Sequence, residues 1–132
     1  MRSKIKILVA IGLCAVISGC SNVPTEEELA NGDYGSVQSP DVCVSIAEAK
    51  IKRHLKDPGS AIFTHEKCVR TYQGNAIILP LQFGYLQRGF VNARNSYGGY
   101  VGDRRYKVLI NNGRVIRWCM ASSNPDLCPP QP

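Results

Sequence analysis

Residues 43–59, CVSIAEAKIKRHLKDPG, decide the fold because they have the pattern of an amphipathic helix. Their apolar residues recur three or four positions apart and therefore share one helical face: Val44, Ala47, Ile51 and Leu55. Ser45 and Glu48 have the spacing of a capping box, and Pro58 disfavours helical geometry at the residue before it. The sequence therefore predicts a helix at roughly residues 43–56.

The residues after this helix have the pattern of extended chain. Residues 61–72 and 76–92 predict two long extended segments, separated by a turn. Residues 105–111 and 114–120 predict a hairpin around Asn112-Gly113, a dipeptide typical of two-residue hairpin turns. We therefore expect an α+β fold, in which one main helix packs on an antiparallel meander of about four strands.

The N-terminus, MRSKIKILVAIGLCAVISGC, has the pattern of a targeting segment. Basic residues precede an apolar stretch at 7–17, which suits a signal peptide and is shorter than the roughly 20 residues of a membrane-spanning helix. The stretch ends in Ile17-Ser18-Gly19-Cys20, which resembles the lipobox of bacterial lipoproteins. The resemblance implies cleavage before Cys20 and lipidation of its thiol. An ordinary secretory signal followed by a chance cysteine is the alternative.

Cleavage there divides the chain into a signal peptide (1–19), a lipid-anchored tether (20–41) and a small periplasmic domain with an irregular tail (42–132). Within the tether, Thr25 and Glu28 have capping-box spacing, so a short helix is expected if it docks on the domain. Ser21, where an Asp would favour the inner membrane, favours an outer-membrane location facing the periplasm.

The charge of the mature chain is modest. The segment 1–19 contains three bases and no acid, so the 16 bases and 10 acids of the whole chain become 13 and 10, and the net charge falls from +6 to +3. The basic character of the precursor therefore overstates any case for a polyanion, and we expect no nucleic-acid partner.

Four cysteines remain besides Cys14 in the signal and Cys20: Cys43, Cys68, Cys119 and Cys128. An even number in an oxidising compartment predicts two disulfides, and the spacings do not fit a zinc site. A helix of about 20 Å and a returning strand of about 27 Å would bring Cys68 near Cys43. We therefore predict Cys43–Cys68 and Cys119–Cys128, although a folded-over sheet would also bring Cys43 near the tail.

Three blocks of the chain resemble a known family: ELANGDYG (28–35), LKDPGSAIF (55–63) and VNARNSYGGYVG (91–102). Together they are similar to a widespread family of small, mostly uncharacterised bacterial envelope lipoproteins, over roughly residues 25–117. The resemblance implies location and fold, and it implies no reaction. Family members often have a cysteine shortly before the Val-Asn pair, where this chain has Gln87-Arg88-Gly89, so their disulfide pattern cannot be copied.

The third block predicts a glycine-rich loop between strands, with two possible roles. Its polar and aromatic side chains suit a sugar, a peptide strand or an anionic group. Alternatively, the asparagines bond the loop backbone, the tyrosines cap the core, and Gly98, Gly99 and Gly102, which permit positive φ and close approach of another backbone, make a tight turn. The predicted binding-loop residues are Asn92, Arg94, Asn95, Tyr97, Tyr100 and Arg104.

No residue pattern predicts a catalytic, metal or cofactor site. His54 and His65 lack a neighbouring nucleophile pattern, and two histidines do not supply the ligands of catalytic zinc. We therefore expect a non-catalytic lipoprotein that binds another envelope component, either a protein or a glycan. The alternatives are an immunity or phage- or plasmid-exclusion lipoprotein and, less favoured, a peptidoglycan-directed enzyme.

Overall fold

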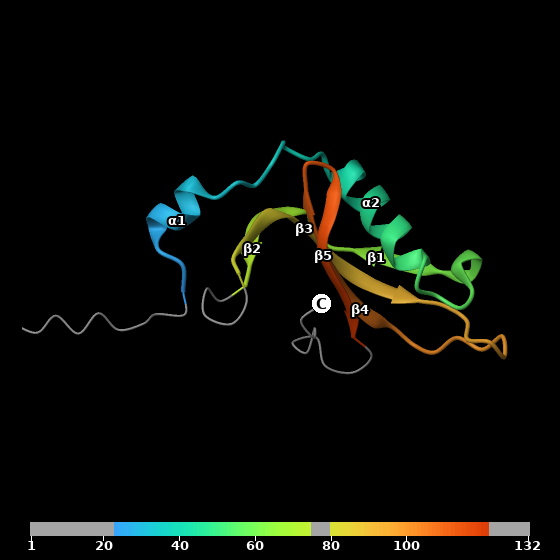
Figure 1. The fold of residues 1–132 in the computed structure, drawn as a ribbon. Helices are drawn as coiled ribbons and strands as arrows, with labels where there is room; N and C mark the ends of the chain where they lie inside the picture. Colours follow the sequence, from blue (N-terminus) through green and yellow to red (C-terminus); the bar gives the residue numbers. More distant parts are fainter. Residues whose placement is uncertain (1–22, 75–79, 122–132) are drawn as a thin grey trace, which may run out of the picture.

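The computed structural model describes residues 23–74 and 80–121 (Figure 1). Cys20, Cys128 and the expected signal peptide lie outside the described residues. Within the described residues, two α-helices, one 3-10 turn and five strands follow one another: α1 (Glu26–Asn31), α2 (Pro40–Lys52), η1 (Pro58–Ser60), β1 (Ile62–His65), β2 (Val69–Gln73), β3 (Gln82–Asn92), β4 (Arg104–Asn111) and β5 (Arg114–Ala121).

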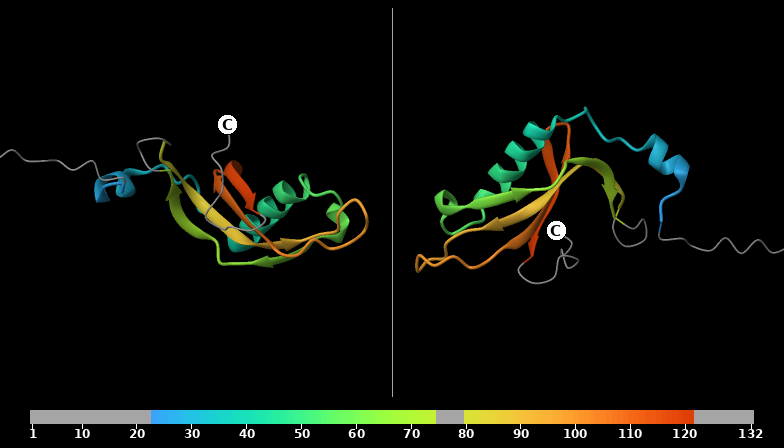
Figure 2. Two further views of the ribbon diagram at one scale, coloured as in Figure 1. Left: turned by 90° about the horizontal axis from the view of Figure 1, so that it is seen from below. Right: turned by 180° about the vertical axis from the view of Figure 1, so that it is seen from behind.

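The strands form one antiparallel sheet in the order β1-β3-β4-β5, with β2 also paired to β3. Figure 2 shows α2 lying along one face of this sheet. The predicted α+β fold is therefore confirmed, including the hairpin of β4 and β5. Asn112 and Gly113 at its tip both have positive φ angles, 49° and 73°, as the hairpin turn requires.

The strand predicted at 61–72 is instead divided into β1 and β2. His65 pairs with Gly89 and Val69 pairs with Leu86, so the three residues at 66–68 face only the two residues between those partners. This extra residue is a bulge, which exchanges the faces on which the later side chains lie. The buried Gln87 side chain donates to the carbonyl of Glu66 in the bulge, at 2.7 Å.

The bulge explains the Cys43–Cys68 disulfide, which confirms the first predicted pairing. Cys68, the last residue of the bulge, lies on the face of the sheet that α2 covers, and the Cα atoms of the two cysteines are 6.4 Å apart. Cys119 is buried in β5 and is also disulfide-bonded. The predicted pairing of Cys119 with Cys128 stays a prediction, because Cys128 lies outside the described residues.

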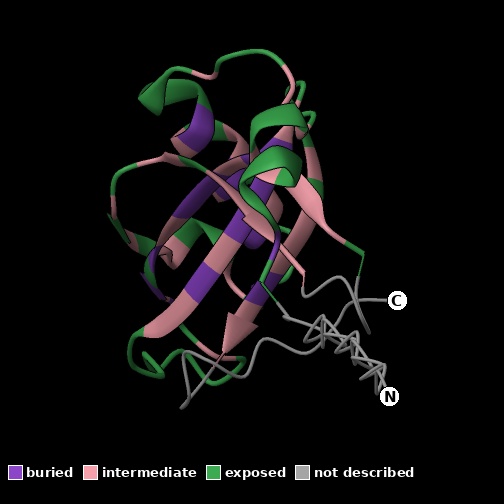
Figure 3. Cartoon of the chain, turned by 90° about the vertical axis from the view of Figure 1, so that its left-hand side faces the viewer, coloured by how far each residue is buried: buried purple, intermediate pink, exposed green. Residues whose placement is uncertain are grey.

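The core lies between α2 and the sheet (Figure 3). It consists of fully or nearly buried side chains from both layers: Cys43, Ala47, Ile51, Leu55, Val91, Ala93, Tyr106, Val108 and Ile110. Three of the four residues of the predicted stripe are among them. Val44 is not, because Cys43, four residues before Ala47 and bonded to Cys68, occupies the buried end of the stripe.

The helix begins earlier and ends earlier than predicted. Ser39 caps it by accepting from the backbone N–H of Val42 at 3.4 Å, and Pro40 occupies the first turn, where its missing N–H costs nothing. The predicted cap at Ser45 is therefore wrong, since this residue lies inside the helix. The last helical residue is Lys52, and single turns continue the chain to Leu55.

The segment expected to be a tether is partly attached to the domain. The predicted capping box of Thr25 and Glu28 is confirmed in α1. Farther along, the Tyr34 ring lies 5.1 Å from the Phe83 ring, and the Asn111 side chain donates to the carbonyl of Asp33 at 2.7 Å. No helix among the described residues is long and apolar enough to cross a membrane.

Candidate functional site

The predicted binding loop connects β3 and β4, and its two asparagines hold its backbone. The side-chain oxygen of Asn95 accepts from the N–H groups of Tyr97 and Gly99, at 2.9 Å and 3.1 Å. That of Asn92 accepts from the N–H of Gly102 at 3.1 Å. These bonds define a rigid loop tip and assign both asparagines the structural role.

The glycines of the loop serve its conformation. Gly98 and Gly102 have φ angles of +83° and +92°, and a Cβ at either position would meet nothing within 4 Å. The expectation of positive φ is therefore confirmed at these two positions, whereas close approach of another backbone is absent there. Gly99 has no positive φ, so the expectation for this residue is wrong.

The aromatic residues of the loop have different surroundings. The Tyr97 side chain is 97% exposed. The Tyr100 hydroxyl donates to the carbonyl of Ser60 at 3.2 Å, and the Arg94 guanidinium lies 5.4 Å from the Tyr100 ring centroid. The Ser60 hydroxyl also accepts from the N–H of Arg94 at 2.8 Å. Ser60 thus links the loop to η1 through two hydrogen bonds. The sequence did not indicate this role, because Ser60 lies in a segment that reads only as the end of a helix.

A cleft of about 150 Å³ separates this loop from the residues that follow α2. Three of the predicted residues line it, namely Arg94, Asn95 and Arg104, whereas the other three do not. His54 and Lys56, from the residues that follow α2, also line it, and neither was among the predicted binding residues. Little in the sequence indicated that Lys56 lines a binding cleft. Basic residues at the end of a helix are common, because they interact favourably with the negative end of the helix dipole.

The cleft is electropositive. Lys56, Arg94 and Arg104 line it, and no carboxylate does. Within residues 23–74 and 80–121, the ion pairs are formed by other bases, namely Lys52, His65, Arg88 and Arg105. The three cleft bases therefore have no carboxylate partner in this part of the chain. A cleft lined by basic side chains that have no carboxylate partner among the described residues favours an anionic ligand.

His54 is held in place at the mouth of this cleft. Its Nδ1 donates to the carbonyl of Lys50 at 3.0 Å, and its ring lies tilted by 35° against Trp118 with centroids 4.0 Å apart. The His54 ring is therefore a held, uncharged or cationic part of the cleft lining beside the bases.

A second polar cluster joins α2 to the sheet. His65 lies between the Glu48 carboxylate, 3.0 Å from its Nε2, and the Tyr106 hydroxyl, 2.7 Å from its Nδ1. Glu48 accepts as a carboxylate, so Nε2 donates and Nδ1 accepts from Tyr106 when the ring is neutral. Glu48 also accepts from Lys52 at 2.8 Å. Sequence spacing does not reveal this chain of hydrogen bonds, because Glu48, His65 and Tyr106 come from three different elements, α2, β1 and β4.

Burial raises the pKa of Tyr106 to about 12. The phenol therefore stays neutral at physiological pH and is a poor nucleophile or base. The Lys52 hydrogen bond, with a smaller effect from His65, lowers the pKa of Glu48 despite its partial burial. The Glu48–His65–Tyr106 chain therefore acts as a polar link between the two layers, and the described residues contain no group of three or more metal-ligating side chains.

Comparison of the chain with protein-family models, with curated proteins and with solved structures finds no match.

Proposed function

We propose that this chain is a non-catalytic bacterial lipoprotein, anchored by Cys20 in the outer membrane, whose domain binds an anionic envelope component. The observation that carries the binding role is the cleft, which Lys56, Arg94 and Arg104 line together with no carboxylate from the described residues. The component is a glycan or a protein that presents a carboxylate or phosphate group. The lipobox-like end of the first twenty residues supports the location.

The mechanism of binding is electrostatic recognition by a preformed site. The asparagine bonds and the attachment to Ser60 fix the loop before a ligand arrives, so little conformational entropy is lost on binding. The two guanidinium groups offer planar, paired donors that match a carboxylate or phosphate, and Lys56 adds a flexible point charge. Tyr97 at the loop tip adds an exposed aromatic face for a sugar ring or an apolar side chain.

The anchor is tested by Cys20→Ser. The variant is expected to stay unprocessed or to be released as a soluble form, because one thiol carries the lipid. Fractionation and metabolic acyl labelling measure the outcome. A variant that is processed, labelled and fractionated like the wild type would contradict the anchor.

The cleft is tested by crosslinking in living cells. A photoreactive residue at Tyr97 should capture the partner, which mass spectrometry identifies, and Arg94→Gln with Arg104→Gln should reduce capture about tenfold, a loss of about 1.4 kcal/mol. Arg117→Gln, on β5 and outside the cleft, is the matched control for charge. Capture that is unaffected by the double variant would contradict binding through the cleft.

A further inference from the structure

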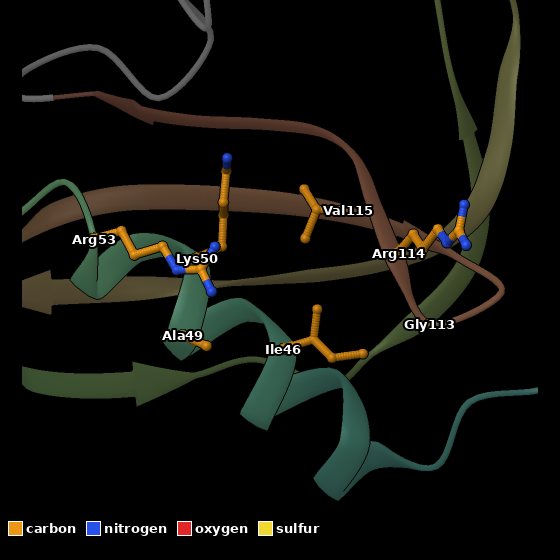
Figure 4. Close-up of a pocket in the computed structure, with 7 residues that line it drawn as sticks. All are labelled: Ile46, Ala49, Lys50, Arg53, Gly113, Arg114 and Val115. Atoms are coloured by element: carbon orange, nitrogen blue, oxygen red, sulfur yellow. The ribbon is translucent and has the colours of Figure 1, made fainter.

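A second hollow lies between α2 and the tip of the β4–β5 hairpin (Figure 4). This groove has a volume of about 350 Å³, within the range of roughly 300–1,000 Å³ that small-molecule sites occupy. Its lining combines two kinds of side chain, apolar and basic. The apolar residues are Ile46, Ala49 and Val115, and the basic residues are Lys50, Arg53 and Arg114.

The helical side of the groove is a distinct face of α2 and its C-cap. Ile46, Ala49, Lys50 and Arg53 have the spacing i, i+3, i+4 and i+7, which places them along one side. The buried stripe of Cys43, Ala47 and Ile51 lies beside it. The same helix therefore packs the core with one face and lines the groove with the next.

The groove has an apolar middle with basic groups around it. In Figure 4, Ile46 from α2 and Val115 from β5 lie across from each other, with Lys50 and Arg53 toward one end and Arg114 toward the other. No carboxylate lines the groove, and the ion pairs of the described residues involve none of its three bases. Such a lining matches a ligand that has both an anionic group and an aliphatic part.

Lys50 occupies a defined position within the groove. Its ammonium lies 5.0 Å from the centroid of the Trp118 ring, at a distance that suits a cation–π contact. Trp118 is the only tryptophan of the chain, so its fluorescence reports on the position of Lys50. A ligand anion that draws Lys50 away from the ring would change the emission.

We propose that this groove binds a small amphiphilic anion, in which a carboxylate or a phosphate is joined to a short aliphatic chain. The aliphatic part lies between Ile46 and Val115, while the anionic head meets Lys50 and Arg53. The site is additional to the loop cleft, with which it shares no lining residue. Because Trp118 also contacts His54 of the cleft, the Lys50 and Arg53 variants, rather than the emission change alone, separate binding in the groove from binding in the cleft.

The test is a titration of the full-length chain followed by tryptophan fluorescence. Octanoate and octyl phosphate, each below its micellar concentration, should give a saturable change in emission. Octanol and inorganic phosphate should bind at least about tenfold more weakly, because each lacks half of the recognised chemistry. Absence of saturation with both octyl anions, or equal binding of octanol, would overturn the proposal.

The two head groups identify the source of the ligand. Preference for octanoate indicates a free carboxylic acid, and preference for octyl phosphate indicates a phospholipid-like head. Vesicles of phosphatidylglycerol provide a third arm. Binding to these vesicles alone, without binding of either soluble anion, would assign the bases to a membrane surface and overturn the groove site.

Variants locate the binding. Lys50→Gln and Arg53→Gln, measured separately, should each weaken octanoate binding about tenfold, as expected for a lost charge-assisted contact. Because Lys50→Gln also alters the reporter, its affinity is checked by calorimetry. Arg114→Gln, on the exposed hairpin tip, removes a basic residue of the groove without altering α2. Arg117→Gln removes the same charge from a position outside the groove and is the control. Wild-type affinity in all three groove variants would contradict the assignment.

Discussion

Gly89 shows how a single residue makes room for the polar link between helix and sheet. It pairs with His65 on β1 and with Tyr106 on β4. A Cβ at this position would clash with the carbonyl oxygen of Thr64 and would lie 2.8 Å from the Tyr106 hydroxyl oxygen. The glycine therefore allows the Tyr106 side chain to cross β3 and reach His65.

Gly89→Ala should therefore destabilise the fold by about 1–3 kcal/mol, the usual cost of overpacking. Urea unfolding at neutral pH measures the change. Gly99→Ala is the matched control, because Gly99 has no positive φ and its Cβ would come no closer than 3.9 Å to Asn95. The control should stay within about 0.5 kcal/mol of the wild type. Equal unfolding midpoints for the two variants would contradict this account of Gly89.

The Glu48 carboxylate should make the fold sensitive to acid. Its pKa is lowered in the folded state from the ordinary value of 4.5, chiefly by the hydrogen bond from Lys52. The carboxylate therefore contributes stability above pH 4.5, and this contribution is lost as the pH falls through the folded pKa.

Glu48→Gln should consequently reduce the loss of unfolding free energy between neutral pH and about pH 3, because the glutamine does not titrate. Urea unfolding of both proteins across this range gives the difference. Asp41→Asn on the exposed first turn of the same helix is the control. An acid dependence that Glu48→Gln leaves unchanged would be inconsistent with the lowered pKa.

At the scale of elements, the β3–β4 loop divides into structural and free positions. Asn92, Asn95 and Tyr100 bond the backbone, whereas the Tyr97 side chain extends into solvent. The sequence pattern placed all four among the predicted binding-loop residues. It does not show which of these side chains form hydrogen bonds to the backbone and which remain free for a ligand.

Tyr97→Ala should leave the free energy of unfolding within about 0.5 kcal/mol of the wild type, as exposed substitutions usually do. Tyr100→Ala should cost about 1 kcal/mol, because it removes the bond to Ser60 and the contact with Arg94. Thermal unfolding followed by circular dichroism separates the two. If Tyr97→Ala were the more destabilising variant, the division of the loop would be wrong.

The α2 helix illustrates how one element serves several purposes. One face is buried in the core, the next lines the groove, and the residues that follow it line the cleft. Its helical periodicity predicted the buried face. The two other uses depend on where the β4–β5 hairpin and the β3–β4 loop come to lie, which the helix sequence does not contain.

At the scale of the whole molecule, the Cys43–Cys68 disulfide ties α2 to the bulge between β1 and β2 across a sequence separation of 25. A small core gains much from such a link, since closing the loop removes conformational entropy from the unfolded chain.

Replacing both cysteines with alanine should therefore lower the free energy of unfolding by about 3 kcal/mol. Chemical denaturation measures the loss, and the corresponding serine pair shows the added cost of a hydroxyl at the fully buried position 43. Non-reducing peptide mapping of the wild type checks the pairing. Recovery of Cys43 joined to Cys119 would contradict the assigned bond.

The parts of this fold that the sequence determined by itself are local. Helical spacing predicted most of the buried face of α2. Asn112-Gly113 predicted the hairpin, because few residue pairs adopt the positive φ angles that a two-residue hairpin turn requires. The lengths of neighbouring elements favoured the Cys43–Cys68 pairing but left a second partner for Cys43 open, which the bulge at 66–68 then decided. The hairpin pattern around Asn112-Gly113 likewise predicted β4 and β5 to within a residue.

Only the tertiary structure decided the features that join distant segments. The bulge at 66–68 arises from pairing with β3, the Glu48–His65–Tyr106 chain joins three elements, and the cleft places Lys56 opposite Arg94. Each depends on contacts between residues far apart in the chain, whose distances are set by packing of the whole core. Local propensity and spacing carry no information on those distances, and for this reason the binding surfaces emerge only when the helix lies on the sheet.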